Sequence, residues 1–203
     1  MSDKPLSLLL LSILIVSCAR PPISPPPPSV FSEKIAVLRP TNRTGDPLPF
    51  SSSFWVLYGS SPEVTVPDIV AAEARLQLQQ KGLAVISPEA IEAAMGTHLP
   101  GSPEEAADMA VHGKLEGNLL YIEIKRWEPG DMSTLRPKEI LVALEASLIE
   151  VTSGRVVWTT HWPLRPVPTP GAINSSGADL IAAHTVVEQL LVSWTIVWPP
   201  GSS

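Results

Sequence analysis

Few side chains in this sequence have the types and spacing that catalysis or metal binding requires. Asp108 and His112 stand four residues apart on an expected helix, where an acid and a base could touch. A solvated helix face is the simpler interpretation. Glu104 and Glu105 are adjacent and so do not share a helix face; capping the helix explains them better than catalysis does.

The other residues that could take part in catalysis or metal binding are equally few. The four histidines (His98, His112, His161 and His184) lie far apart, and a single cysteine allows neither an intramolecular disulfide nor a Cys/His zinc cluster. His98 falls in a loop, and His161 is expected to face solvent from a strand. There is no G-x-S-x-G, P-loop, H-E-x-x-H or EF-hand pattern. We therefore expect no catalytic residue, no metal site and no cofactor.

The one cysteine ends an apolar run near the amino terminus. Lys4 precedes the stretch from Leu6 to Val16, whose 11 residues include only two serines. This length is typical of the apolar region of an export signal and is too short for a bilayer, which needs about 20 residues. Residues 1–17 are therefore predicted to be a signal peptide.

The residues around the expected cleavage point are Ile15-Val16-Ser17-Cys18, which resembles the bacterial lipobox. The resemblance implies that Cys18 receives a diacylglyceryl group, that the signal is cut before it, and that the new amine is acylated. Several acyl chains make a stable membrane anchor. The alternative is an ordinary secretory signal followed by an incidental cysteine. Ala19, in place of Asp, implies passage to the periplasmic face of the outer membrane in enteric bacteria.

A proline-rich segment, "ARPPISPPPPS", follows the cysteine. Polyproline II rises about 3.1 Å per residue, so residues 19–32 would hold a domain roughly 40 Å from the lipid. Residues 18–32 are thus predicted to be the lipidated cysteine and its tether; a ligand for a proline-recognising module is the alternative. One domain over 33–198 and a tail over 199–203 complete the organisation. The net charge of -6 argues against nucleic acid as a partner.

The domain is expected to run β-α-β-α-α-β-β-β-α. "KIAVL" (34–38) and "LAVIS" (83–87) read as buried strands. Pro67 to Lys81 is expected to form a helix with Ile69, Ala72 and Leu76 on one face. Ser87 and Ser102 each have the position of an N-cap, the second in an S-x-x-E capping box.

The second half of the domain combines strands with a last helix. Residues 120–125, 140–148 and 156–162 alternate as antiparallel strands do, with Val156, Trp158, Thr160 and Trp162 on one side and a turn at Thr152-Ser153-Gly154. The last helix is expected from Ser176, with Asp179 at the box position. Its apolar stripe comprises Leu180, Ala183, Val187, Leu190, Leu191 and Trp194. The simplest packing is a single mixed β-sheet with helices mainly on one face, of the α+β or α/β class.

Several of these pieces occur together in one known group. A lipobox, a proline-rich tether, "LRPTNRTGD", "LLYIEIKRWEP" and "EVTSGRVVW" resemble outer-membrane lipoproteins whose domain is similar to the amino-terminal domain of TolB. Relatives of that group include the lipoprotein activator of penicillin-binding protein 1B and the curli-secretion lipoprotein. The turn matches at Pro40, Asn42, Thr44, Gly45 and Asp46, and the hairpin at Thr152, Gly154 and Trp158. Arg39 and Gly117-Asn118 depart from the pattern, which leaves the subgroup open.

The resemblance implies a non-catalytic envelope lipoprotein that binds another protein or serves as an envelope-assembly component. It would contact the membrane through the acyl chains on Cys18, and its partner would be an unknown envelope protein. Association into a homo-oligomer is a further possibility. A periplasmic hydrolase or small-ligand-binding lipoprotein is the alternative. No strands are spare for a curli-type pore.

The long loop from Thr41 to Ser61 is the expected docking element, because loops of this length are uncommon and often functional. The candidate partner-binding residues are Asn42, Arg43, Asp46, Phe50, Phe54, Trp55 and Tyr58. The competing interpretation is that the loop folds back and its aromatics cover the sheet edge. Of the tryptophans, Trp158 and Trp194 fit the core. Trp55, Trp127, Trp162 and Trp198 could serve the core or binding equally well.

Overall fold

A computed structural model describes residues 34–50, 64–130, 138–192 and 194. Its elements are β1 (Lys34–Val37), β2 (Thr41–Asn42), α1 (Val66–Gln80), β3 (Ala84–Val85), α2 (Pro88–Met95), α3 (Pro103–His112), β4 (Asn118–Pro129), β5 (Glu139–Glu150), β6 (Arg155–Pro168) and α4 (Ser175–Val192). The expected order of elements is confirmed, with the two-residue strand β2 added. Residues 1–33 and 195–203, and with them the predicted signal, tether and tail, lie outside the described residues.

The six strands form one mixed sheet in the order β3-β1-β4-β5-β6, with β2 paired to β4. Strand β1 is parallel to both β3 and β4, whereas β5 is antiparallel to both of its neighbours, β4 and β6. The tight turn predicted before Arg155 joins β5 to β6, and Gly154 has a φ of 66° there, a conformation that suits glycine. The fold class predicted from the sequence is therefore confirmed.

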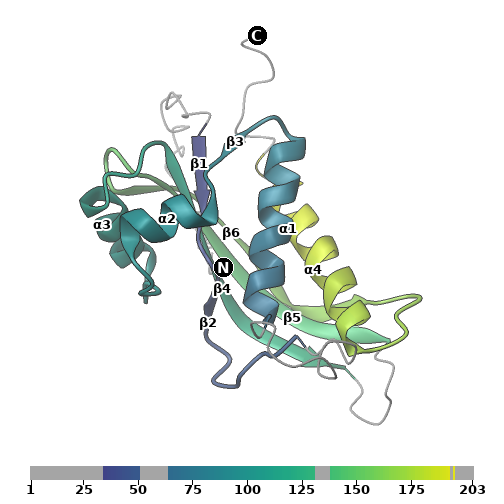
Figure 1. The fold of residues 1–203 in the computed structure, drawn as a ribbon. Coiled ribbons are helices and arrows are strands. Elements are labelled where there is room, and N and C mark those ends of the chain that lie inside the picture. Colours follow the sequence, from purple (N-terminus) through teal and green to yellow (C-terminus); the bar gives the residue numbers. More distant parts are fainter. Residues whose placement is uncertain (1–33, 51–63, 131–137, 193, 195–203) are drawn as a thin grey trace, which may run out of the picture. The chain divides into compact units, whose positions relative to one another are not determined.

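Alternate residues of the buried strands face two separate cores. Ile35 and Val37 of β1 lie in the core that α1 and α4 cover, while Ala36 of β1 and Leu38 just after it lie in the core with α2 and α3. In Figure 1 these two pairs of helices lie on opposite sides of β1 and β4. The expectation of helices mainly on one face thus holds for the two longest helices only.

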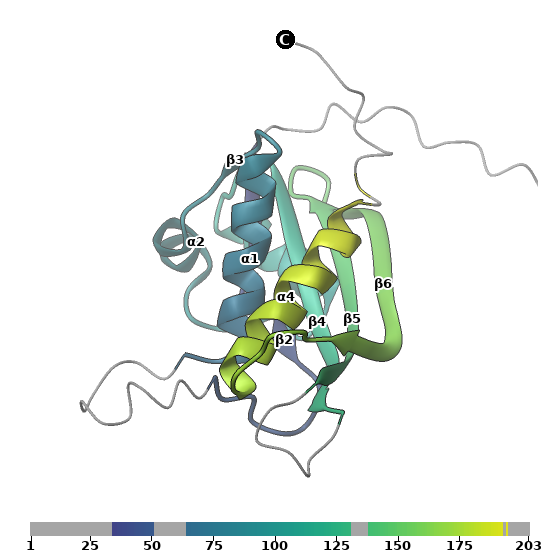
Figure 2. The same ribbon diagram turned by 90° about the vertical axis from the view of Figure 1, so that its right-hand side faces the viewer.

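Helix α1 lies against both the sheet and α4 (Figure 2). Its buried face includes Val70, Ala74 and Leu78, whereas Ala72 and Leu76 are exposed. The predicted face of Ile69, Ala72 and Leu76 is therefore wrong apart from Ile69. Small residues on the true face allow α4 to approach closely.

Two apolar residues, Leu180 on α4 and Val156 on β6, lie outside the core, contrary to the predicted patterns. Leu180 was expected in the stripe of α4 but is exposed; the other five predicted members are buried. Val156 is also exposed, because the register shifts between Leu148 and Ile149 and so turns Val156 away from the side of Trp158.

Trp158 stacks on Trp194 with ring centroids 5.7 Å apart. Trp127 and Trp162 are buried, so both belong to the core.

The start of α4 differs from the prediction in an informative way. Asn174, not Ser176, caps the helix: its Oδ1 accepts a hydrogen bond from the Gly177 N–H at 2.8 Å. Asp179 does not cap the helix; it is buried, and it accepts a hydrogen bond from the indole Nε1–H of Trp127 at 2.8 Å. Burial raises the pKa of Asp179 to about 6, although the Trp127 hydrogen bond opposes this.

Asp179→Asn should therefore change the pH dependence of stability. A carboxyl group whose pKa is higher in the folded state favours folding when protonated, and this contribution is lost as pH rises from about 4 through about 6. The variant should match the wild type near pH 4 and be more stable at pH 7.5, by up to about 3 kcal/mol. Urea unfolding at both pH values measures this. The exposed Asp46→Asn is the control, and an equal effect of Asp179→Asn at the two pH values would contradict the assignment.

Candidate partner-binding surface

The turn after β1 is held by its own polar side chains. Thr41 and Asn42 pair with β4 at Glu123 and Ile124. The Asn42 side chain donates to the Asp46 carbonyl at 2.7 Å and accepts from the Thr44 N–H at 3.0 Å. Gly45 supplies the left-handed conformation, with a φ of 86°. The turn is thus fixed in shape while Asp46 stays exposed.

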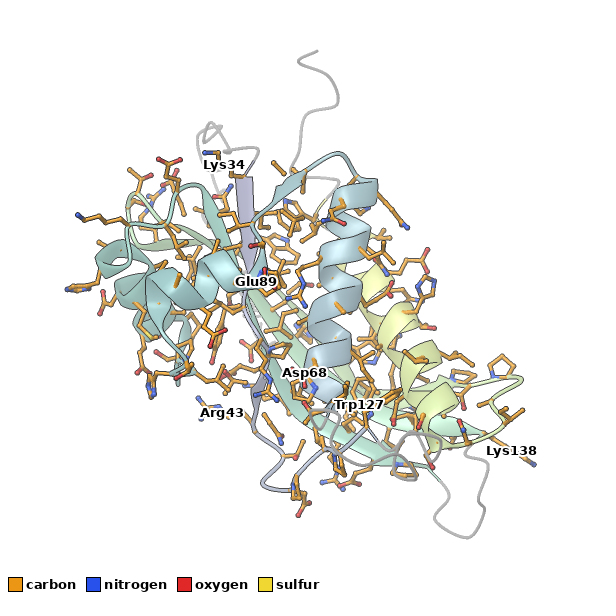
Figure 3. The ribbon with its side chains drawn as sticks, in the orientation of Figure 1. Lys34, Arg43, Asp68, Glu89, Trp127 and Lys138 are labelled. Carbon is orange, nitrogen blue, oxygen red and sulfur yellow. The ribbon has the colours of Figure 1, made fainter. Side chains whose placement is uncertain are left out.

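Arg43 ties this turn to two other parts of the fold. Its Nε lies 3.1 Å from the Glu123 carboxylate on β4, and its Nη2 donates a hydrogen bond to the Gly101 carbonyl before α3. Figure 3 shows Arg43 at the β2 end of the sheet. The hydrogen bond with Glu123 raises the pKa of Arg43 above its usual value. Arg43 is therefore a bracing residue as well as a surface cation.

Glu123 is the centre of a small polar network on β4. Its carboxylate accepts from the Tyr121 hydroxyl at 3.0 Å and pairs with Lys125 at 2.9 Å, and Lys125 also pairs with Glu145 at 2.8 Å. Burial alone would raise the pKa of Glu123, but hydrogen bonds from Lys125, Tyr121 and Arg43 outweigh it and lower the pKa. Every charge in this network has a partner, which favours a structural role over acid-base chemistry.

The base of the long loop is closed by backbone hydrogen bonds. The Phe50 N–H donates to the Val64 carbonyl, and the Val66 N–H to the Leu48 carbonyl, both at 2.9 Å. Phe50 is half-buried and packs against the core shared with α1. Phe54, Trp55 and Tyr58 lie outside the described residues. The described part of the loop therefore has a fixed start and a fixed end.

Arg39, at which the sequence departs from the pattern of the lipoprotein group, forms an ion pair. In the structure its Nε lies 2.7 Å from the Asp68 carboxylate, at the start of α1. Asp68 also accepts from the Thr65 N–H at 2.9 Å and the Thr65 hydroxyl at 2.7 Å, which completes a capping box. Burial opposes these interactions, yet together they lower the pKa of Asp68. This pair joins the end of β1 to α1.

The candidates for chemistry are not assembled into a catalytic site. His112 Nδ1 donates to the backbone carbonyl of Asp108 at 2.7 Å, so the acid-base pair that the spacing allowed is not formed. Glu105 accepts from the Gly101 N–H at 2.5 Å and pairs with His98 at 3.2 Å, which supports its capping role. His161 is exposed, as predicted. Within the described residues, no group of His, Cys, Asp and Glu side chains could hold a metal ion.

Several solved structures have a fold similar to that of this chain. No protein-family model and no curated protein matches the chain. Among solved structures, the PelC dodecamer of Paraburkholderia phytofirmans is 19% identical, with a TM-score of 0.42 over 80% of this chain and 91% of that one. Lipoprotein GNA1162 of Neisseria meningitidis is 16% identical, with a TM-score of 0.43 over 81% and 94%.

The C-terminal domain of LpoB from Salmonella enterica is also similar. It is 17% identical, with a TM-score of 0.41 over 66% of this chain and 82% of that domain. The similarity in fold to a lipoprotein that the sequence led us to expect is thus found for GNA1162. In the part of the chain that the structure describes, no helix is both long and apolar enough to cross a membrane. What the protein does must be inferred from its own residues.

Proposed function

We propose that this chain is a bacterial envelope lipoprotein that works without catalysis by docking another envelope protein. Its anchor would be the acyl chains on Cys18, placed at the periplasmic face of the outer membrane, with residues 18–32 as the tether. The run Ile15-Val16-Ser17-Cys18 and the prolines after it support this anchoring. The folded domain would then act at a distance from the lipid surface.

The observation that carries the docking role is the rigid base of the long loop. Backbone hydrogen bonds at Phe50 and Val66 hold both ends of the loop, beside a turn that Asn42 and Arg43 brace. Aromatic side chains on a fixed base offer a large contact area at low cost in rotamer entropy. Phe54, Trp55 and Tyr58 would be the anchors, and the exposed Asp46 a charged contact at their edge.

The test is a double substitution, Phe54→Ala with Trp55→Ala, in the full lipoprotein in its native envelope. Two lost aromatic anchors cost about 2–4 kcal/mol of binding, so chemical crosslinking should recover at least tenfold less partner. The melting temperature of the purified protein should barely change.

A matched control removes two exposed apolar side chains elsewhere, Leu164→Ala with Ile173→Ala. This control should leave partner recovery unchanged. If the Phe54/Trp55 variant loses stability, and recovery falls only as its folded fraction falls, then the loop covers the sheet edge and the docking role is wrong.

A further inference from the structure

A crevice opens where the chain leaves the parallel strands in two directions. After β1 the chain leads to α1 on one face of the sheet, and after β3 it leads to α2 on the other. In open sheets with parallel strands, ligands bind at such a switch point, beyond the carboxyl ends of the strands. Here the crevice has a volume of about 390 Å³, which falls in the range of small-molecule sites.

The walls of this crevice are largely apolar. Arg39, Asp68, Arg75, Glu92 and His98 are the ionisable side chains of its lining. The apolar side chains among the lining residues are Val37, Leu38, Ala71, Pro88, Ile91, Met95, Leu99 and Pro100. A molecule that fits the crevice would therefore bury an apolar group against α1 and α2.

Among the described lining residues, Arg75 is the cationic side chain that the fold leaves without a direct partner. Arg39 is neutralised by Asp68 at 2.7 Å, and His98 pairs with Glu105. Arg75 is half-buried, and its guanidinium makes no hydrogen bond or ion pair with any described residue. Burial lowers the pKa of Arg75, and the more distant Asp68 and Glu89 offset this only in part. Asp68 lies in the first turn of α1 and Glu89 in the first turn of α2 (both labelled in Figure 3).

Such a guanidinium fits one carboxylate well. Its planar fork binds a carboxylate through two parallel hydrogen bonds, and a charged hydrogen bond is worth about 1.5–3 kcal/mol. With one unpaired cation among the described lining residues, a singly charged group matches the crevice better than a phosphate. Glu92, whose side chain is exposed, adds a negative charge at the crevice and disfavours a second anionic group.

We propose that the crevice between α1 and α2 binds a carboxylate that carries a small apolar group, with Arg75 holding the carboxylate and Met95 and Ile91 contacting the apolar group. This proposal does not rest on the docking role proposed for the loop. The carboxylate could belong to a free small molecule or to the carboxyl terminus of a peptide, which present the same chemistry.

The probe is N-acetyl-leucine, compared with N-acetyl-leucinamide, which lacks the charge. The full chain in detergent is labelled with ¹³C at the methionine methyl groups. Met95 lines the crevice, whereas Met109 on α3 does not and serves as an internal reference. The acid should shift the Met95 signal saturably, with a dissociation constant of about 1 mM, and the amide should bind at least tenfold more weakly. The Met109 signal should not move.

Two variants and one further ligand sharpen the result. Arg75→Gln should abolish the difference between acid and amide, while Arg155→Gln, an exposed arginine on β6, should preserve it; an unchanged Met109 signal shows that each variant is folded. The tetrapeptide Ala-Ala-Ala-Leu distinguishes the two sources: tighter binding than N-acetyl-leucine points to a peptide terminus, and equal binding to a small molecule. The proposal is overturned if Met95 does not respond, if acid and amide bind equally to the wild type, or if their difference survives in Arg75→Gln.

Discussion

Trp194→Ala is expected to lower the free energy of unfolding by about 3–5 kcal/mol, since truncating a buried tryptophan removes apolar contacts and leaves a cavity. Trp194 is 5% exposed and stacks on Trp158 of β6, so it fastens the end of α4 to the edge strand of the sheet. A change of this size should lower the melting temperature of a domain of this length by about 10 °C. Thermal unfolding followed by circular dichroism measures it.

Leu180→Ala on α4, the helix that ends just before Trp194, is the matched control. Leu180 is 51% exposed, and alanine is at least as good a helix former, so the change in stability should stay within about 0.5 kcal/mol. An unchanged melt for Trp194→Ala would show that the end of α4 is not docked on the sheet. Equal losses in both variants would show that the helix packs by a different face.

Much of the sheet could be predicted because its signals are local. The run "KIAVL" is apolar at every position except the first, and β1 is indeed buried on both faces. The period of two in β4 and β5, and the Thr-Ser-Gly turn before β6, define a hairpin from neighbouring residues alone. The bulge that turns Val156 outward leaves no comparable mark in the sequence, because it depends on how β6 pairs with β5.

The start of α4 shows where local rules become ambiguous. Asn174, Ser175 and Ser176 are all good N-cap residues, and Ser176 with Asp179 has the spacing of a capping box. Asp179 is not available for capping because it accepts a hydrogen bond, inside the core, from the indole N–H of Trp127, which lies 52 positions before it in the sequence. A contact between segments this distant cannot be read from either segment alone.

The crevice between α1 and α2 was missed for a related reason. The predicted face of α1 contains Ala72 and Leu76, and nothing in the sequence singles out Arg75. The true face packs against both the sheet and α4, and it leaves Arg75 half-buried in the crevice. An arginine without a partner among the described residues has no signature in the sequence; it becomes visible only when the contacts of the neighbouring cations, Arg39 and His98, are known.

The lipid anchor carries the largest effect that we expect, since it is all or none. If Cys18 is the acylation site, cells fed an alkyne analogue of palmitate should label the wild-type protein, and Cys18→Ser should carry no label, because serine offers no thiol for the diacylglyceryl group. The unprocessed variant should also keep residues 1–17 and appear larger by mass spectrometry. Asp46→Asn, at an exposed position in the folded domain, should be labelled as strongly as the wild type.

Metabolic labelling of the wild type and Cys18→Ser side by side is therefore the most direct test of an envelope lipoprotein. We predict a strong signal on the mature wild-type protein, which begins at Cys18, and no signal on the variant. Equal labelling of the two proteins, or an unlabelled wild type whose signal has been removed at another residue, would contradict the account.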